Sequence, residues 1–144
     1  MATSNAATNY LERRLLHYIF KNNSLSFSSP GDSIYVGLCT AVSAAETGSV
    51  TEASFGAYAR QQVAAASWTT IGADSTDTQT AKNTSAIEFP AKSDSGNVTI
   101  THVIIADASS SGNILFVGAL DASKTLAQND IFRINATNLS IELK

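Results

Sequence analysis

Apolar and polar residues alternate along most of the chain, and a period of two residues is typical of β-strands with a buried face. Gly112 and Asn113 suit a hairpin turn, so the apolar runs on either side of them should pair as antiparallel neighbours. The last two runs should pair with each other across a short turn rich in Asn and Thr. In all, the pattern predicts strands at residues 33–40, 60–65, 87–89, 98–106, 114–120, 131–134 and 139–143.

One segment near the start of the chain follows a helical period instead. Apolar residues recur at helical intervals from Leu11 to Ile19, and Asn9 precedes Glu12 at the spacing of a capping box. These signals predict an amphipathic helix over residues 9–21. The side chains of Arg13, Arg14 and His17 lie off the apolar stripe, where they form a solvated face or contact an acidic neighbour.

The remaining segments are polar and have no clear period. Residues 1–8 hold too few apolar side chains to pack, so we expect a flexible N-terminal arm that a partner orders. Residues 41–57 and 72–85 are predicted to form long loops. No helical pattern separates the strands, so we expect an all-β fold, an antiparallel β-sandwich over residues 33–144 with one N-terminal amphipathic helix, in a single domain.

Composition narrows the choice of partners. Charged residues make up only 15% of the 144 residues, and the net charge of -3 provides no basic field to neutralise the phosphates of nucleic acid. The start of the chain lacks the basic and apolar regions of a signal peptide, and no apolar run is long enough to cross a bilayer. We therefore expect synthesis in the bacterial cytoplasm, with no nucleic-acid or membrane partner.

No motif for catalysis or for binding a cofactor is found in the sequence. The glycines do not cluster at the spacing of a phosphate-binding loop, and no serine lies in a Gly-x-Ser-x-Gly elbow. His17 and His102 fall on different predicted elements, and Cys39 is a lone cysteine in the middle of a strand, where we expect it to be buried. We accordingly expect no enzymatic activity, cofactor, metal ion or small-molecule substrate.

Tyr58 and Arg60 form a pair that alternates on one face of a strand. The guanidinium of Arg60 is able to fork onto a carboxylate or to stack on a ring. Two readings stay open at this point. Arg60 either holds the preceding loop down within one subunit or crosses to a neighbouring molecule.

Three stretches in a fixed order carry a family resemblance: "TNYLERRLLHYIF" from Thr8, "IYVGLCTA" leading into "GAYARQQV", and "ADASSSGNILFVGAL" from Ala106. They resemble a family of small virion proteins of tailed bacteriophages, whose members are described either as capsid decoration (cement) proteins or as tail-fibre components. The resemblance runs from about Asn9 to Leu143 and implies a scaffold without reaction chemistry.

From this resemblance we expect a structural virion protein that binds and stabilises the outer surface of a phage capsid, as a homotrimer in contact with the major capsid protein. The alternative is a tail or tail-fibre structural or adaptor component. Neither role requires catalysis. The candidate interface residues are Asn5, Thr8, Tyr10, Arg13, Arg14, His17, Glu52, Tyr58 and Arg60.

Overall fold

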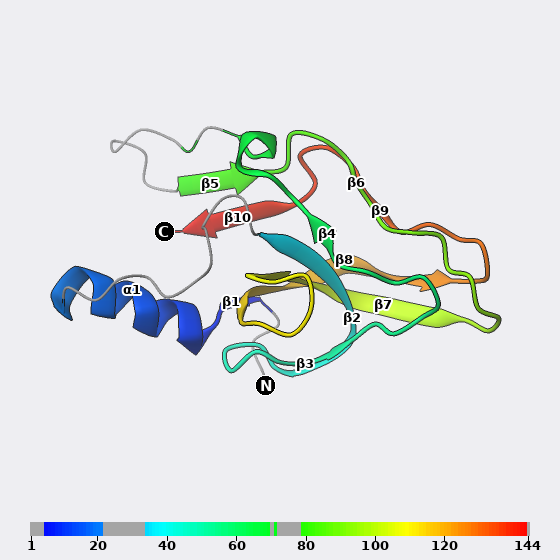
Figure 1. The fold of residues 1–144 in the computed structure, drawn as a ribbon, viewed down its shortest axis with the longest axis horizontal. Helices are drawn as coiled ribbons and strands as arrows, with labels where there is room; N and C mark the ends of the chain where they lie inside the picture. The colour runs from blue at the N-terminus through cyan, green and yellow to red at the C-terminus, as the bar shows by residue number, and fades with distance from the viewer. Residues whose placement is uncertain (1–4, 22–33, 70, 72–78, 144) are drawn as a thin grey trace.

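The computed structural model of the chain describes residues 5–21, 34–69, 71 and 79–143. Strands dominate this part of the chain, and one helix precedes most of them (Figure 1). The elements are β1 (Ala6–Ala7), α1 (Asn9–Lys21), β2 (Tyr35–Ala44), β3 (Ser49–Glu52), β4 (Gln61–Gln62), a 3-10 turn (Ala65–Ser67), β5 (Gln79–Lys82), β6 (Ile87–Glu88), β7 (Val98–Ala106), β8 (Ile114–Leu126), β9 (Arg133–Ile134) and β10 (Ser140–Leu143).

The long strands form one twisted antiparallel sheet. Its order is β1-β8-β7-β2-β3, and β4 pairs with β2 as a sixth strand. The β7–β8 ladder runs from Val98 opposite Leu126 to Ala106 opposite Ile114, which confirms the predicted hairpin. The loop that joins them is held by Asp107, whose two carboxylate oxygens accept hydrogen bonds from the backbone and side-chain amides of Asn113.

Two small sheets, β5–β10 and β6–β9, complete the fold. They lie along one side of the main sheet (Figure 1), and their apolar residues join its core. The main core brings Val36 of β2 together with Ile134 of β9 and Leu139, which precedes β10. The predicted all-β, antiparallel fold class is confirmed, with the second layer divided between two short strand pairs.

Strand β2 is buried on both faces. Val36 and Leu38 belong to the main core, whereas Cys39 points to the other face and packs with Ile104 and Val117 in a second apolar cluster. This arrangement explains why the strand contains almost no polar side chain before Thr40. The expected burial of Cys39 is confirmed by an exposure of 0%.

The prediction of a long loop at residues 41–57 was wrong. Strand β2 continues to Ala44, the chain turns at Gly48 with a φ of 68°, and β3 returns to Glu52. The hairpin has no clear apolar alternation in the sequence, because small hydroxyl residues occupy positions on both of its strands. Ser43 and Ser49, for example, hydrogen-bond across it at 2.8 Å and form no apolar face. Part of the second predicted loop, residues 79–82, is also a strand, while residues 72–78 lie outside the described part of the chain.

The predicted pairing of the last two strands was also wrong. Strand β9 pairs with β6, and β10 pairs with β5. Buried Asn83 separates them: its side-chain amide donates to the Asn135 carbonyl at 2.9 Å, and its side-chain oxygen accepts from the Leu139 amide at 2.9 Å. One side chain thus occupies the turn and directs the two strands into different sheets.

The strand expected at residues 60–65 is shorter than predicted. Only Gln61–Gln62 form β4, and a 3-10 turn follows at Ala65–Ser67.

The predicted flexible arm is fixed to the sheet at residues 5–8, while residues 1–4 lie outside the described part of the chain. Strand β1 pairs with β8, and the side-chain oxygen of Asn5 accepts a hydrogen bond from the Ala119 amide at 2.6 Å.

The helix that follows is confirmed with the predicted bounds. Its cap is Thr8 rather than Asn9, because the Thr8 hydroxyl oxygen lies 3.4 Å from the Leu11 amide that donates to it.

We predict that Cys39 reacts slowly with thiol reagents in the folded protein. Burial, with a smaller contribution from the negative charge of Glu52, raises the pKa of its thiol to about 12, so little reactive thiolate forms at neutral pH. Ellman's reagent with native and urea-unfolded protein measures this. The variant Ala41→Cys, which places a thiol at an exposed position on the same strand, should label rapidly, and equally rapid labelling of the unmodified chain would contradict the prediction.

Candidate interaction surface

Glu52, Tyr58 and Arg60 form one hydrogen-bonded cluster, here called the clamp. Arg60 forks onto Glu52 through Nε and Nη2, each 2.8 Å from a different carboxylate oxygen. The Tyr58 hydroxyl donates to the same carboxylate at 2.7 Å and accepts from the Leu38 amide of β2 at 3.0 Å. A Cβ on Gly37 would lie 3.0 Å from the Tyr58 hydroxyl oxygen, so the glycine leaves room for the ring.

The remaining donors of Arg60 reach the β7–β8 loop. Its Nη1 lies 2.8 Å from the carbonyl oxygens of both Ala108 and Ser111. The side chain is only 6% exposed, so nearly all of its hydrogen-bonding capacity serves its own chain. These contacts agree with the reading in which Arg60 holds segments down within one subunit.

The clamp also sets the charges of its members. Burial raises the pKa of the Glu52 carboxyl, but the hydrogen bonds from Arg60 and Tyr58 and the charge of Arg60 together outweigh this, so its pKa is lowered. The hydrogen bonds and charge of Glu52 raise the pKa of Arg60. Burial and the Glu52 hydrogen bond raise the pKa of Tyr58. The pair therefore stays ionised and Tyr58 stays neutral at physiological pH.

A second group of predicted interface residues anchors and forms α1. Thr8 is 1% exposed, and its hydroxyl donates to the Ile114 carbonyl at 2.6 Å. The Asn9 amide donates to the Glu46 carbonyl at 2.6 Å, so the first turn of α1 is joined both to β8 and to the β2–β3 turn. The helix is therefore fixed at its N-terminal end, separate from the clamp.

The orientation of α1 is opposite to the one that its amphipathic pattern favours. One face of the helix is partly buried, and it carries Tyr10, Arg14 and His17. On this face the Arg14 guanidinium carbon lies 5.3 Å from the centre of the Tyr10 ring. Arg13 is exposed. Arg14 and His17, predicted to lie on a solvated face or to contact an acidic neighbour, are partly exposed, and no residue of the helix is buried.

The outward face of α1 carries the apolar residues. Phe20 is 73% exposed and Ile19 is 58% exposed, although such side chains are usually inside. We call this set the outer face of α1, and it consists of Leu15, Leu16, Tyr18, Ile19 and Phe20. Figure 1 shows the helix projecting beside the strands rather than lying across them. Exposed apolar surface of this kind makes the outer face of α1 a candidate binding surface.

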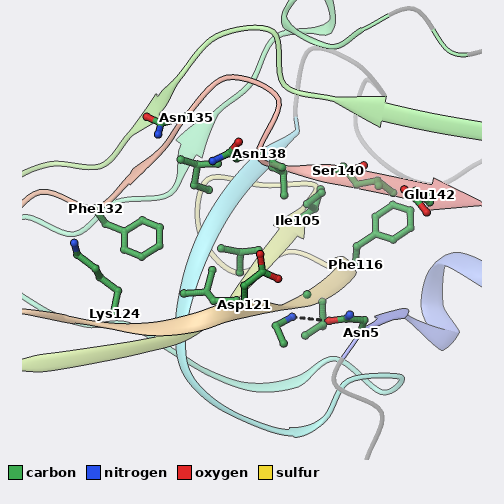
Figure 2. A pocket seen from close by; sticks show the side chains of 18 of the residues that line it. Asn5, Ile105, Phe116, Asp121, Lys124, Phe132, Asn135, Asn138, Ser140 and Glu142 are labelled. Atoms are coloured by element: carbon green, nitrogen blue, oxygen red, sulfur yellow. Dashed lines mark hydrogen bonds between the residues drawn. The ribbon is translucent and has the colours of Figure 1, made fainter.

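A groove of about 1060 Å³ lies between β1 and β8 on one side and β9 and β10 on the other. Figure 2 shows the Phe116 ring in it, Asp121 projecting into it from β8, and Glu142 on β10. Ile131 and Leu143 line the groove and are 48% and 56% exposed, respectively. The lining thus combines apolar side chains with two carboxylates and with two basic side chains, Lys124 and Arg133.

Other buried polar residues have structural roles that sequence analysis missed. Lys92 is 2% exposed, and its Nζ donates to the carbonyl and carboxylate oxygens of Asp94 at 2.6 and 2.9 Å. Within the described ranges, every buried side-chain polar atom has a partner, and no three metal-ligating side chains converge. No helix in those ranges is long and apolar enough to cross a membrane.

The sequence identified the members of the clamp, but it predicted a flexible arm that includes Thr8, and the outer face of α1 and the groove were not predicted. The apolar stripe was visible in the sequence, yet a stripe does not state whether its partner belongs to the same chain. The groove depends on the separation of β9 from β10, and no local pattern in the sequence indicates that separation.

Comparison with known families adds one match. The family model described as "Podophage GP4 fiber I protein gp80" matches residues 6–142. The matched range begins in β1 and ends in β10, so it includes the helix, the clamp and nearly all of the residues that line the groove. No curated protein matches the chain.

We predict that Arg60→Ala lowers the free energy of unfolding by about 3 kcal/mol, because it leaves the Glu52 carboxylate without its buried partner. Arg60→Lys should recover only part of this loss, since an ammonium does not reproduce the fork. Urea unfolding measures both. The control is Arg133→Ala, which removes an exposed pair with Glu88 and should change stability by less than about 1 kcal/mol. Equal losses for the two alanine variants would contradict the proposed role of the clamp.

The clamp should also make stability depend on pH. Because the pKa of Glu52 is lowered on folding from its ordinary value of 4.5, the clamp stabilises the protein above that pH. This contribution is lost as the pH falls through the lower, folded-state pKa. Urea unfolding at a series of acidic pH values should show a steeper decline for the unmodified protein than for Glu52→Gln. Parallel declines would assign the acid sensitivity to other carboxyl groups.

Proposed function

Because the chain belongs to the podophage GP4 fiber I protein family, which makes it a structural protein of the bacteriophage virion, we propose that it forms part of a tail fibre or joins a fibre to the tail. The observation that carries this proposal is the family match over residues 6–142, which includes the helix and every described strand except the last residue of β10. The name of the family supports the tail alternative better than the capsid-decoration reading.

The proposed role is mechanical. The ionisable groups with the strongest interactions, Glu52, Tyr58 and Arg60, are bound to one another and to backbone groups of β2 and of the β7–β8 loop. Such a cluster stabilises a scaffold, and we propose no catalytic activity and no cofactor, nucleic acid, membrane or small molecule as a partner. The partners that we propose are further copies of this chain and the adjoining tail proteins, with a trimer expected from the family resemblance.

Two exposed surfaces of the protein support this structural role. The outer face of α1 and the groove both present apolar side chains to solvent, and both lie outside the clamp. A protein that binds a large structural partner needs surface of this kind, since a stable contact buries about 800 Å² on each side. The capsid-decoration reading, with the major capsid protein as partner, uses the same surfaces and differs in location.

We predict that the protein is found at the tail of the virion. Particles carrying Ala41→Cys can be labelled with maleimide-coupled gold, because the buried Cys39 of the unmodified protein is a poor target for the reagent. Electron microscopy should show gold at the tail, with unmodified particles as the control for non-specific labelling. Gold distributed over the shell would instead support capsid decoration.

A further inference from the structure

The outer face of α1 needs a partner that the described part of its own chain does not provide. Isolated helices of 13 residues are marginal in water, and this helix buries none of its residues. Its five outward side chains expose roughly 600 Å² of mainly apolar surface, against about 800 Å² per side in a stable interface. The outer face of α1 alone therefore supplies most of the area that one partner contributes to a stable interface.

Charge indicates what this partner is. The helix carries three basic residues, Arg13, Arg14 and Lys21, and one acidic residue, Glu12. The rest of the chain therefore carries six basic and eleven acidic residues. A basic helix is attracted to the acidic body of another copy, whereas helices packed on one another would bring their basic residues together.

The groove provides the matching surface on that body. It combines the exposed apolar residues Ile131 and Leu143 with the carboxylates of Asp121 and Glu142. Lys124 and Arg133 also line it, and Arg133 pairs at 3.2 Å with Glu88, which does not line the groove. The groove thus offers an apolar lining for the outer face of α1 and carboxylates for the exposed Arg13 and Lys21, whereas Arg14 stacks on Tyr10 on the opposite face of the helix.

We propose that the outer face of α1 of one subunit docks into the groove of a second copy of this chain. Helix and groove are adjacent in each subunit, because β1 lines the groove and leads directly into α1. Each subunit therefore offers one helix and one groove, a heterologous contact that closes into a ring when the rotation between copies permits. This proposal does not depend on where in the virion the protein is located.

The first test measures self-association by sedimentation of the full chain. The unmodified protein should be larger than its 15.1 kDa monomer, and Ile19→Asp should raise the dissociation constant by about tenfold or more. The matched control is Ile71→Asp, which changes another exposed isoleucine that belongs neither to the outer face of α1 nor to the lining of the groove and should have no effect. Circular dichroism checks that each variant is folded. A monomeric unmodified protein, or equal effects of the two variants, would overturn the proposal.

The second test identifies the contacting surfaces by disulfide formation. Phe20→Cys mixed with Leu143→Cys or with Ile131→Cys should give a crosslinked pair of chains on oxidation, while Phe20→Cys alone should not. The buried Cys39 contributes little background. Crosslinking of Phe20→Cys to itself would show that helices pack on helices, and no crosslinking in either mixture would show that the groove is not the site. Either result would overturn the proposal.

Discussion

The fork of Arg60 on Glu52 is the interaction on which the rest of the structure depends. It joins the end of β3 to the segment that precedes β4, and the same guanidinium holds the β7–β8 loop through two carbonyl groups. Tyr58 extends this network to the backbone of β2. A planar donor with several N–H groups suits this role, because one guanidinium here serves both carboxylate oxygens of Glu52 and two backbone carbonyls.

Two unusual backbone conformations lie next to the clamp. Ala57 has a φ of 67° and Ser111 a φ of 53°, values that residues other than glycine seldom adopt. Ala57 precedes Tyr58, and the carbonyl of Ser111 is bound by Arg60. The hydrogen bonds of the clamp offset the backbone strain at these positions, of order 1 kcal/mol each. Asn83 and Lys92 resemble Arg60 in one respect: each is a buried polar side chain whose hydrogen bonds to the backbone hold nearby segments in place.

Elements with a strong local signal were predictable from the sequence. The helix, the β7–β8 hairpin and the buried Cys39 each follow from the period of a few neighbouring residues. The pairings of β5 with β10 and of β6 with β9 were not predictable, because they join segments distant in the sequence. At the candidate site, the sequence identified the members of the clamp, but only the structure shows that they contact one another and that the apolar side of α1 faces outward.

The attachment of α1 has a mechanical consequence. Thr8 is a buried pivot at one end of the helix, and exposure increases toward Phe20 at the other. A helix of 13 residues is about 20 Å long, so a rotation of about 10° at the pivot moves its far end by roughly 3 Å. A small change in the backbone at Thr8 would therefore displace Ile19 and Phe20 of the outer face much further than the residues of the first turn.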